Sequence, residues 1–123
     1  MATTVILNHT RIRQITRAVQ VSLEQTAEAL HTDVINASVI PFDVGTLQNV
    51  STFVDRKDSK NGVVRIVHTA PYARRLYYHP EYNFSKKENA NAQGMWWQPW
   101  IDGAKKNFAR DTFKKLFRRN ANL

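Results

Sequence analysis

Apolar residues recur at steps of three, four and seven over residues 10 to 38, the spacing that places them on one face of a helix. The stripe consists of Ile12, Ile15, Val19, Leu23, Leu30, Val34 and Ala37. Asn8 or Thr10 can supply the capping oxygen at the start, and Pro41 stops any continuation. The pattern predicts a long amphipathic helix of roughly 40 Å, preceded by an arm at residues 1 to 9.

The spacing changes in the region from residue 43 to residue 79. Two runs rich in β-branched residues, at 49 to 56 and 63 to 69, flank the dipeptide Asn61-Gly62, which is a hairpin signal. The residues between the first run and this dipeptide are polar and predict a longer, mobile loop. We expect a turn followed by an antiparallel hairpin.

Residues 80 to 98 predict a long loop that nevertheless contains large apolar side chains. Its many polar residues argue against burial along the whole length, whereas each large apolar side chain left in water costs roughly 1.5 to 3 kcal/mol. A partner surface resolves this conflict, so the loop is a candidate subunit contact. The candidate anchors are Tyr82, Phe84, Trp96 and Trp97. The alternative is that the tryptophans plug the end of the core, and Trp100 is the favoured core residue.

A second helical pattern covers residues 99 to 119, with Pro99 in its first turn. Its apolar stripe comprises Ile101, Ala104, Phe108, Phe113, Leu116 and Phe117. The rest of its surface carries Lys105, Lys106, Arg110, Lys114, Lys115, Arg118 and Arg119. A charge run on a helix is usually a solvated face, and these positives match no DNA-reading module. They are a candidate contact for an acidic protein partner or for DNA phosphates.

The net charge indicates the kind of partner, and the length indicates the number of domains. Eighteen Lys and Arg against ten Asp and Glu give a net charge of +8, most of it in the C-terminal part of the chain, which favours nucleic acid or an acidic protein as partner. At 123 residues we expect one domain of the α+β class, with the long N-terminal helix and the basic C-terminal helix packed on a small antiparallel β-sheet. No apolar run reaches membrane-spanning length, so we expect no membrane contact.

Catalytic and metal-binding patterns are missing from the sequence. There is no cysteine, and the four histidines, at positions 9, 31, 68 and 79, have no paired ligand spacing. For His68 and His79 a hydrogen-bonded structural role is favoured over that of a ligand or base. Asp43 is best explained as a turn residue, with Gly45 at positive φ in the same turn. We expect no enzyme activity, no metal and no cofactor.

Several stretches resemble the minor capsid proteins of siphophages and prophages of Gram-positive bacteria. One is Asp-Val-Gly-Thr-Leu-Gln-Asn at residues 43 to 49, and a second is Thr-Ala-Pro-Tyr-Ala-Arg-Arg-Leu-Tyr-Tyr-His-Pro at residues 69 to 80. Tyr-Asn-Phe-Ser at 82 to 85 and Asn-Ala-Gln-Gly-Met-Trp-Trp at 91 to 97 extend the likeness. It covers residues 43 to about 119. The first two stretches are also similar to the broader set of tail-completion and head-tail joining proteins, although the aromatic loop is longer here.

This resemblance implies a structural, ring-forming connector in the neck of a tailed phage, made in the host cytoplasm and incorporated into the virion. It implies homo-oligomerisation, with a hexamer expected first and a dodecamer second. The implied partners are the neighbouring connector and tail proteins, with DNA passing non-specifically through the lumen. The alternative function is a basic nucleic-acid-binding module without sequence readout, and a small enzyme is a distant third.

Overall fold

The longest element of the fold is a helix. The computed structural model describes residues 2 to 41, 52 to 86 and 89 to 123. Helix α1 (His9–Asn36) has 28 residues and is about 42 Å long. The side-chain oxygen of Asn8 accepts a hydrogen bond from the Arg11 amide at 3.0 Å and caps the helix. After Asn36 the chain turns through Ser38, which has a left-handed φ of 58°. The predicted long helix is confirmed.

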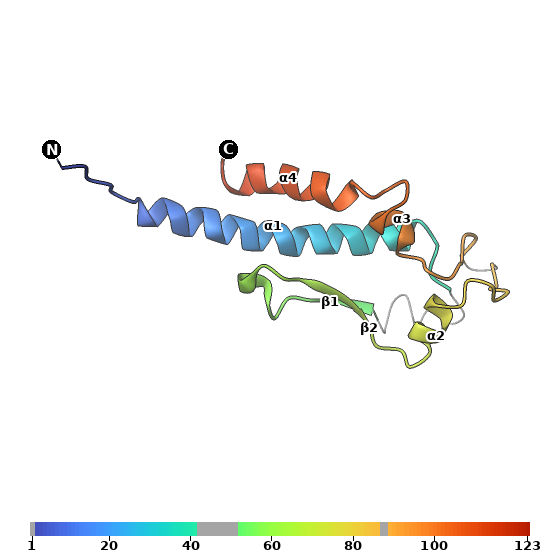
Figure 1. Cartoon of the computed structure of the whole chain (residues 1–123). Helices are drawn as coiled ribbons and strands as arrows, with labels where there is room; N and C mark the ends of the chain where they lie inside the picture. Colours follow the sequence, from blue (N-terminus) through green and yellow to red (C-terminus); the bar gives the residue numbers. More distant parts are fainter. Residues whose placement is uncertain (1, 42–51, 87–88) are drawn as a thin grey trace.

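Helix α1 forms the middle layer, with a β-hairpin on one side and helix α4 (Phe108–Asn120) on the other (Figure 1). Strands β1 (Thr52–Asp55) and β2 (Arg65–His68) pair antiparallel, with Phe53 opposite Val67. The predicted α+β class is confirmed. The expected packing of both helices on the sheet is wrong in one respect, because α4 lies against α1 and not against the strands.

The hairpin tip is held against α1. It forms the short 3₁₀ helix η2 (Ser59–Asn61), which Gly62 ends at a left-handed φ of 83°. The Ser59 side chain is buried, accepts a hydrogen bond from Gln20 at 3.0 Å and donates one to Glu24 at 3.3 Å. The prediction of a mobile loop here is therefore wrong, since the tip is hydrogen-bonded to the long helix.

The face that α1 turns toward α4 consists of small residues. Ala18, Ser22 and Thr26 are buried and lie one turn apart, whereas Ile12 and Val19 of the predicted stripe are 45% and 37% exposed. Small side chains let the second helix approach closely, and its Asn120 side chain donates a hydrogen bond to the Ser22 hydroxyl at 2.9 Å. The predicted stripe is therefore buried only in its C-terminal part.

The single C-terminal helix predicted over residues 99 to 119 is two helices. Helix α3 (Gln98–Ile101) is one turn long, and α4 begins only at Phe108. Between them Gly103 approaches Pro99 so closely that a Cβ atom would lie 2.7 Å from the Pro99 Cα. The amide of Lys105 donates back to the Pro99 carbonyl at 2.9 Å. The chain thus folds back on α3 before α4 starts.

The hydrophobic core lies at the C-terminal end of α1. Its buried residues are Val34, Val39, Ile40, Ala70, Ala73, Trp96 and Trp100. They come from α1, the segments around it, the short helix α2 (Ala73–Tyr77), the aromatic loop and α3. By contrast, α4 contains no buried residue. The molecule is well packed at one end of α1 and thinly covered at the other.

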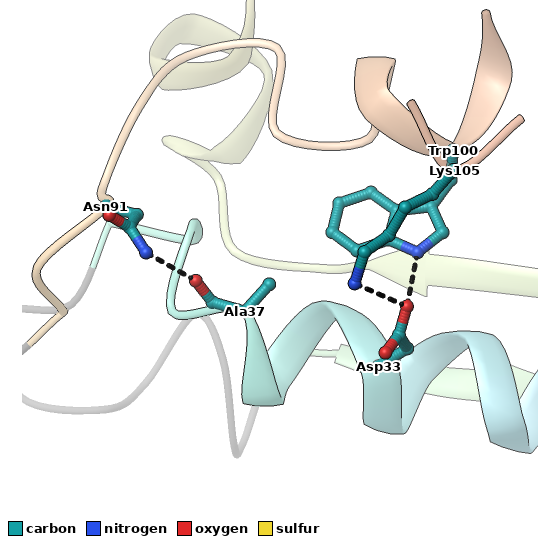
Figure 2. Close-up of polar contacts among 5 residues, drawn as sticks. All are labelled: Asp33, Ala37, Asn91, Trp100 and Lys105. Carbon is teal, nitrogen blue, oxygen red and sulfur yellow. Dashed lines mark hydrogen bonds and ion pairs between the residues drawn. The ribbon is translucent and has the colours of Figure 1, made fainter. Parts of the chain in front are cut away.

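Asp33 connects the long helix to the C-terminal segment. Its carboxylate accepts a hydrogen bond from the Trp100 indole at 2.8 Å and from the Lys105 ammonium at 3.1 Å (Figure 2). The same view shows the Asn91 side chain donating to the Ala37 carbonyl, at 3.0 Å. The side chain of Asp33 is only 25% exposed, so its bonds are partly shielded from water.

We predict that Asp33→Ala lowers the free energy of unfolding by about 1 to 3 kcal/mol, because the partly buried Trp100 N–H loses its acceptor. Asp33→Asn should lose less, since its amide oxygen still accepts from the indole. Asp102→Ala is the control: it removes an exposed carboxylate and should shift stability by less than about 0.5 kcal/mol. Denaturant titrations of the three variants give the values, and equal losses for Asp33→Ala and Asp102→Ala would contradict the role of Asp33.

Candidate functional site: the basic end of the α1/α4 layer

The antiparallel packing of α4 brings the end of the chain to the N-terminal half of α1 (Figure 1). The Arg11 guanidinium donates to the Ala121 carbonyl at 2.7 Å. About three turns further along α1, Asn120 bonds to Ser22 and, also at 2.9 Å, to Gln25. Residues about a hundred positions apart in the sequence therefore share one end of the molecule.

This packing gathers cations without carboxylates. We call the group the basic end: it comprises Arg11, Arg13, Arg17, Lys114, Lys115, Arg118 and Arg119. Residues 2 to 23 and 112 to 123 contain no Asp or Glu, and the acidic residues that border them, Glu24 and Asp111, already bond to Ser59 and Arg110. The ion pairs found among the described residues all lie elsewhere. The positive potential is thus concentrated at this end.

A groove of about 640 Å³ runs between the two helices at the basic end. Its lining is Thr10, Arg11, Arg13, Gln14, Arg17, Ala18, Val21, Asn120 and Asn122. Arginine, amide and hydroxyl groups dominate this set, and Ala18 and Val21 are its apolar members. This surface presents many hydrogen-bond donors, and the apolar stems of the arginines line much of the rest of it.

The basic residues predicted from the sequence do not form one surface. Lys114, Lys115, Arg118 and Arg119 lie on the exposed side of α4, opposite the half-buried apolar face. Lys105 and Lys106 precede α4, and Lys105 pairs with Asp33. Arg110 pairs with its neighbour Asp111 at 3.4 Å.

Sequence reasoning missed the three arginines of α1 because residues 1 to 40 together carry no net charge. The signal that could have found them is the absence of any carboxylate before Glu24.

A second cluster surrounds His68 at the end of β2. The indoles of Trp96 and Trp97 both donate to its Nε2, at 3.3 and 2.8 Å, and its Nδ1 lies 2.7 Å from the Thr52 hydroxyl. A nitrogen that accepts two N–H groups carries no proton of its own. Burial lowers the pKa of His68, and the nearby His31 lowers it further. The expected structural role of His68 thus agrees with its hydrogen bonds.

The four candidate anchors of the aromatic loop separate into two groups. Tyr82 is 37% exposed and stacks on His79 at a centroid distance of 4.7 Å, and Phe84 is half-buried beside it. Trp96 is 1% exposed and belongs to the core, and Trp97 is half-buried against it. The prediction that Trp96 is an exposed anchor is therefore wrong.

The physical reason is that the second half of the loop is bonded to the rest of the fold. The amide of Gln93 donates to the Val39 carbonyl at 2.9 Å, and that of Met95 donates to the Tyr77 carbonyl at 2.8 Å. These bonds direct the following indole inward. The candidate turn residues Asp43 and Gly45 lie outside the described residues, so their predicted turn stays a prediction.

Comparisons with known proteins give no relatives: no family, no curated protein and no solved structure matches the chain. Within the described ranges, no helix is long and apolar enough to cross a membrane. The same ranges bring together no group of three or more potential metal ligands.

We predict that Trp96→Ala destabilises the monomer by about 3 to 5 kcal/mol, because it empties a fully buried site. Tyr82→Ala should cost less than about 1 kcal/mol, since that ring is substantially exposed. Thermal melts of the two variants separate a core residue from a surface one. Similar melting temperatures would mean that Trp96 does not support the core.

Stability should also fall as the pH drops, because His68 is held neutral in the fold. The pKa of His68 in the folded protein lies below the ordinary 6.5, so the unfolded chain binds the proton more readily. The stability that neutral His68 contributes is therefore present above about pH 6.5 and is lost as the pH falls below it. Melting temperatures from pH 7.5 to 5 measure this. His68→Gln keeps an acceptor and should flatten the profile, whereas the exposed-site control His9→Gln should not; two identical profiles would refute the assignment.

Proposed function

We propose that the chain is a non-catalytic structural subunit of a head-tail connector ring in a tailed phage. Two independent lines support this proposal: the amount and kind of surface that the monomer exposes, and the resemblance to minor capsid and head-tail joining proteins. The exposed surface supports a role in an assembly, and the resemblance indicates which assembly it is.

The observation that carries the assembly role is the accessible surface. The chain exposes 8554 Å², whereas a compact monomer of 14.2 kDa is expected to expose about 6,800 Å². The excess, about 1,800 Å², is close to what a ring subunit buries in two standard interfaces of about 800 Å² per partner. A monomer this open gains stability by associating, because association removes surface that its own layers leave uncovered.

The exposed surface includes apolar groups suited to subunit contacts. Phe113 and Phe117 of α4 stack at 6.0 Å and are only half-buried, since a single helix covers them. Ile101, the last residue of α3, is 63% exposed, and Ile12 and Val19 of α1 are exposed as well. Apolar and aromatic residues of this kind form the centres of protein interfaces.

The resemblance adds the identity of the assembly. It supports a homo-oligomeric ring, a hexamer first and a dodecamer second, that contacts neighbouring connector and tail proteins. In this proposal the protein is made in the host cytoplasm, becomes part of the virion neck, and surrounds passing DNA.

We predict that a phage lacking this gene yields DNA-filled heads and separate tails, which a plasmid copy of the gene joins again. Electron microscopy of the two lysates and their infectious titres provide the test, and native mass spectrometry of the purified protein gives the subunit number. Normal joined, infectious particles from the deletion lysate would reject the connector function. A strictly monomeric protein, both alone and in virions, would reject the ring.

A further inference from the structure

The structure assigns a second property to the basic end: we infer that its groove and the adjoining exposed face of α4 bind the phosphate backbone of double-stranded DNA without reading its sequence. The connector proposal explains where DNA would be met, but the binding itself does not depend on that proposal. DNA binding and the connector function are therefore tested by different experiments.

The basic end combines three arginines of α1 with four cations on the exposed face of α4, and the ranges 2 to 23 and 112 to 123 that supply them contain no Asp or Glu. Cations that serve only solubility are usually interspersed with carboxylates, as around the hairpin, where Arg56 pairs with Glu28 of α1 and Arg65 pairs with Asp58. A surface of one sign attracts a polyanion over a distance of several ångströms.

The groove is lined by groups that can bind phosphate. Arg13 and Arg17 lie one helical turn apart on α1, and Asn120 and Asn122 line the opposite side. At about 640 Å³ the groove has room for roughly twenty water molecules, enough for a hydrated phosphodiester segment. Guanidinium and amide groups are the side chains that bind phosphate oxygens in protein–DNA complexes.

The surface suits a DNA duplex better than a single strand or a protein partner. None of the residues lining the groove is aromatic, so unstacked bases of a single strand would find no ring to stack on. The exposed face of α4 likewise carries lysines and arginines with no apolar residue among them. The centre of a protein interface usually contains aromatic or apolar anchors, which this face lacks. Binding to the regular phosphate backbone of a duplex requires neither stacking rings nor apolar anchors.

The test measures binding of the full-length protein to two 30-base-pair duplexes of unrelated sequence by fluorescence anisotropy, from 50 to 200 mM salt. We expect equal affinities for the two sequences and a steep fall with salt, with a slope of about −6 if all seven cations take part. The variants R13A/R17A and K115A/R119A should each reduce the magnitude of this slope by about 1.8 and weaken binding at least tenfold at 100 mM salt.

The matched control is R74A/K106A, which also lowers the net charge from +8 to +6 but removes exposed cations away from the basic end. It should change affinity less than threefold. R13K/R17K keeps both charges and should retain most of the binding, and circular dichroism verifies that every variant is folded.

Three results would overturn the inference. They are the absence of salt-dependent DNA binding by the unaltered protein, an equal loss of affinity in the basic-end and control double variants, and a strong preference for one duplex sequence. Competition with polyglutamate distinguishes DNA binding from the binding of an acidic protein. If it displaces DNA at equal charge concentration, the surface is a docking site for an acidic protein instead. Each of these outcomes leaves the deletion lysate, and thus the connector proposal, unaffected.

Discussion

Helix α1 contacts both outer layers, the hairpin and α4, and much of the rest of the structure depends on this constraint. One face of the helix receives the hairpin through Gln20, Glu24 and Glu28, which bond to Ser59 and Arg56. Another receives α4 through small residues that let the two helices approach closely. Neither outer layer packs extensively on the other, although His68 of β2 also bonds to the aromatic loop. This arrangement and the exposed arm at residues 2 to 8 leave much of the surface accessible.

The same constraint separates the molecule into two chemically different ends. At the C-terminal end of α1 the aromatic loop, α2 and α3 enclose a core around Trp96 and Trp100. At the N-terminal end only the last turns of α4 cover the helix, and arginines and lysines remain in water. Burial and charge are therefore divided along a single helix.

Local patterns predicted the local features well. The periodicity and the Asn8 cap placed the long helix within one or two residues, and Asn61-Gly62 located the hairpin turn. Features that depend on distant contacts were not predictable. The burial of Ser59 requires α1 as a hydrogen-bond partner. The inward course of Trp96 follows from Met95, whose φ is 47°, and from Gly94, where a Cβ atom would lie 2.7 Å from the Pro80 Cα. The basic end arises only when α4 folds back on α1, because its two halves are about a hundred residues apart.

The absence of buried residues in α4 also affects how the protein opens. Amide protons exchange with solvent through local unfolding, and the free energy of each opening depends on how much buried surface it exposes. Phe108, at the start of α4, packs against the tryptophan core, so release of the helix beyond this residue breaks one helix–helix contact and leaves that core closed. The helix is thus a cooperative unit of low stability attached to one of higher stability, and its amides exchange before those in the C-terminal half of α1.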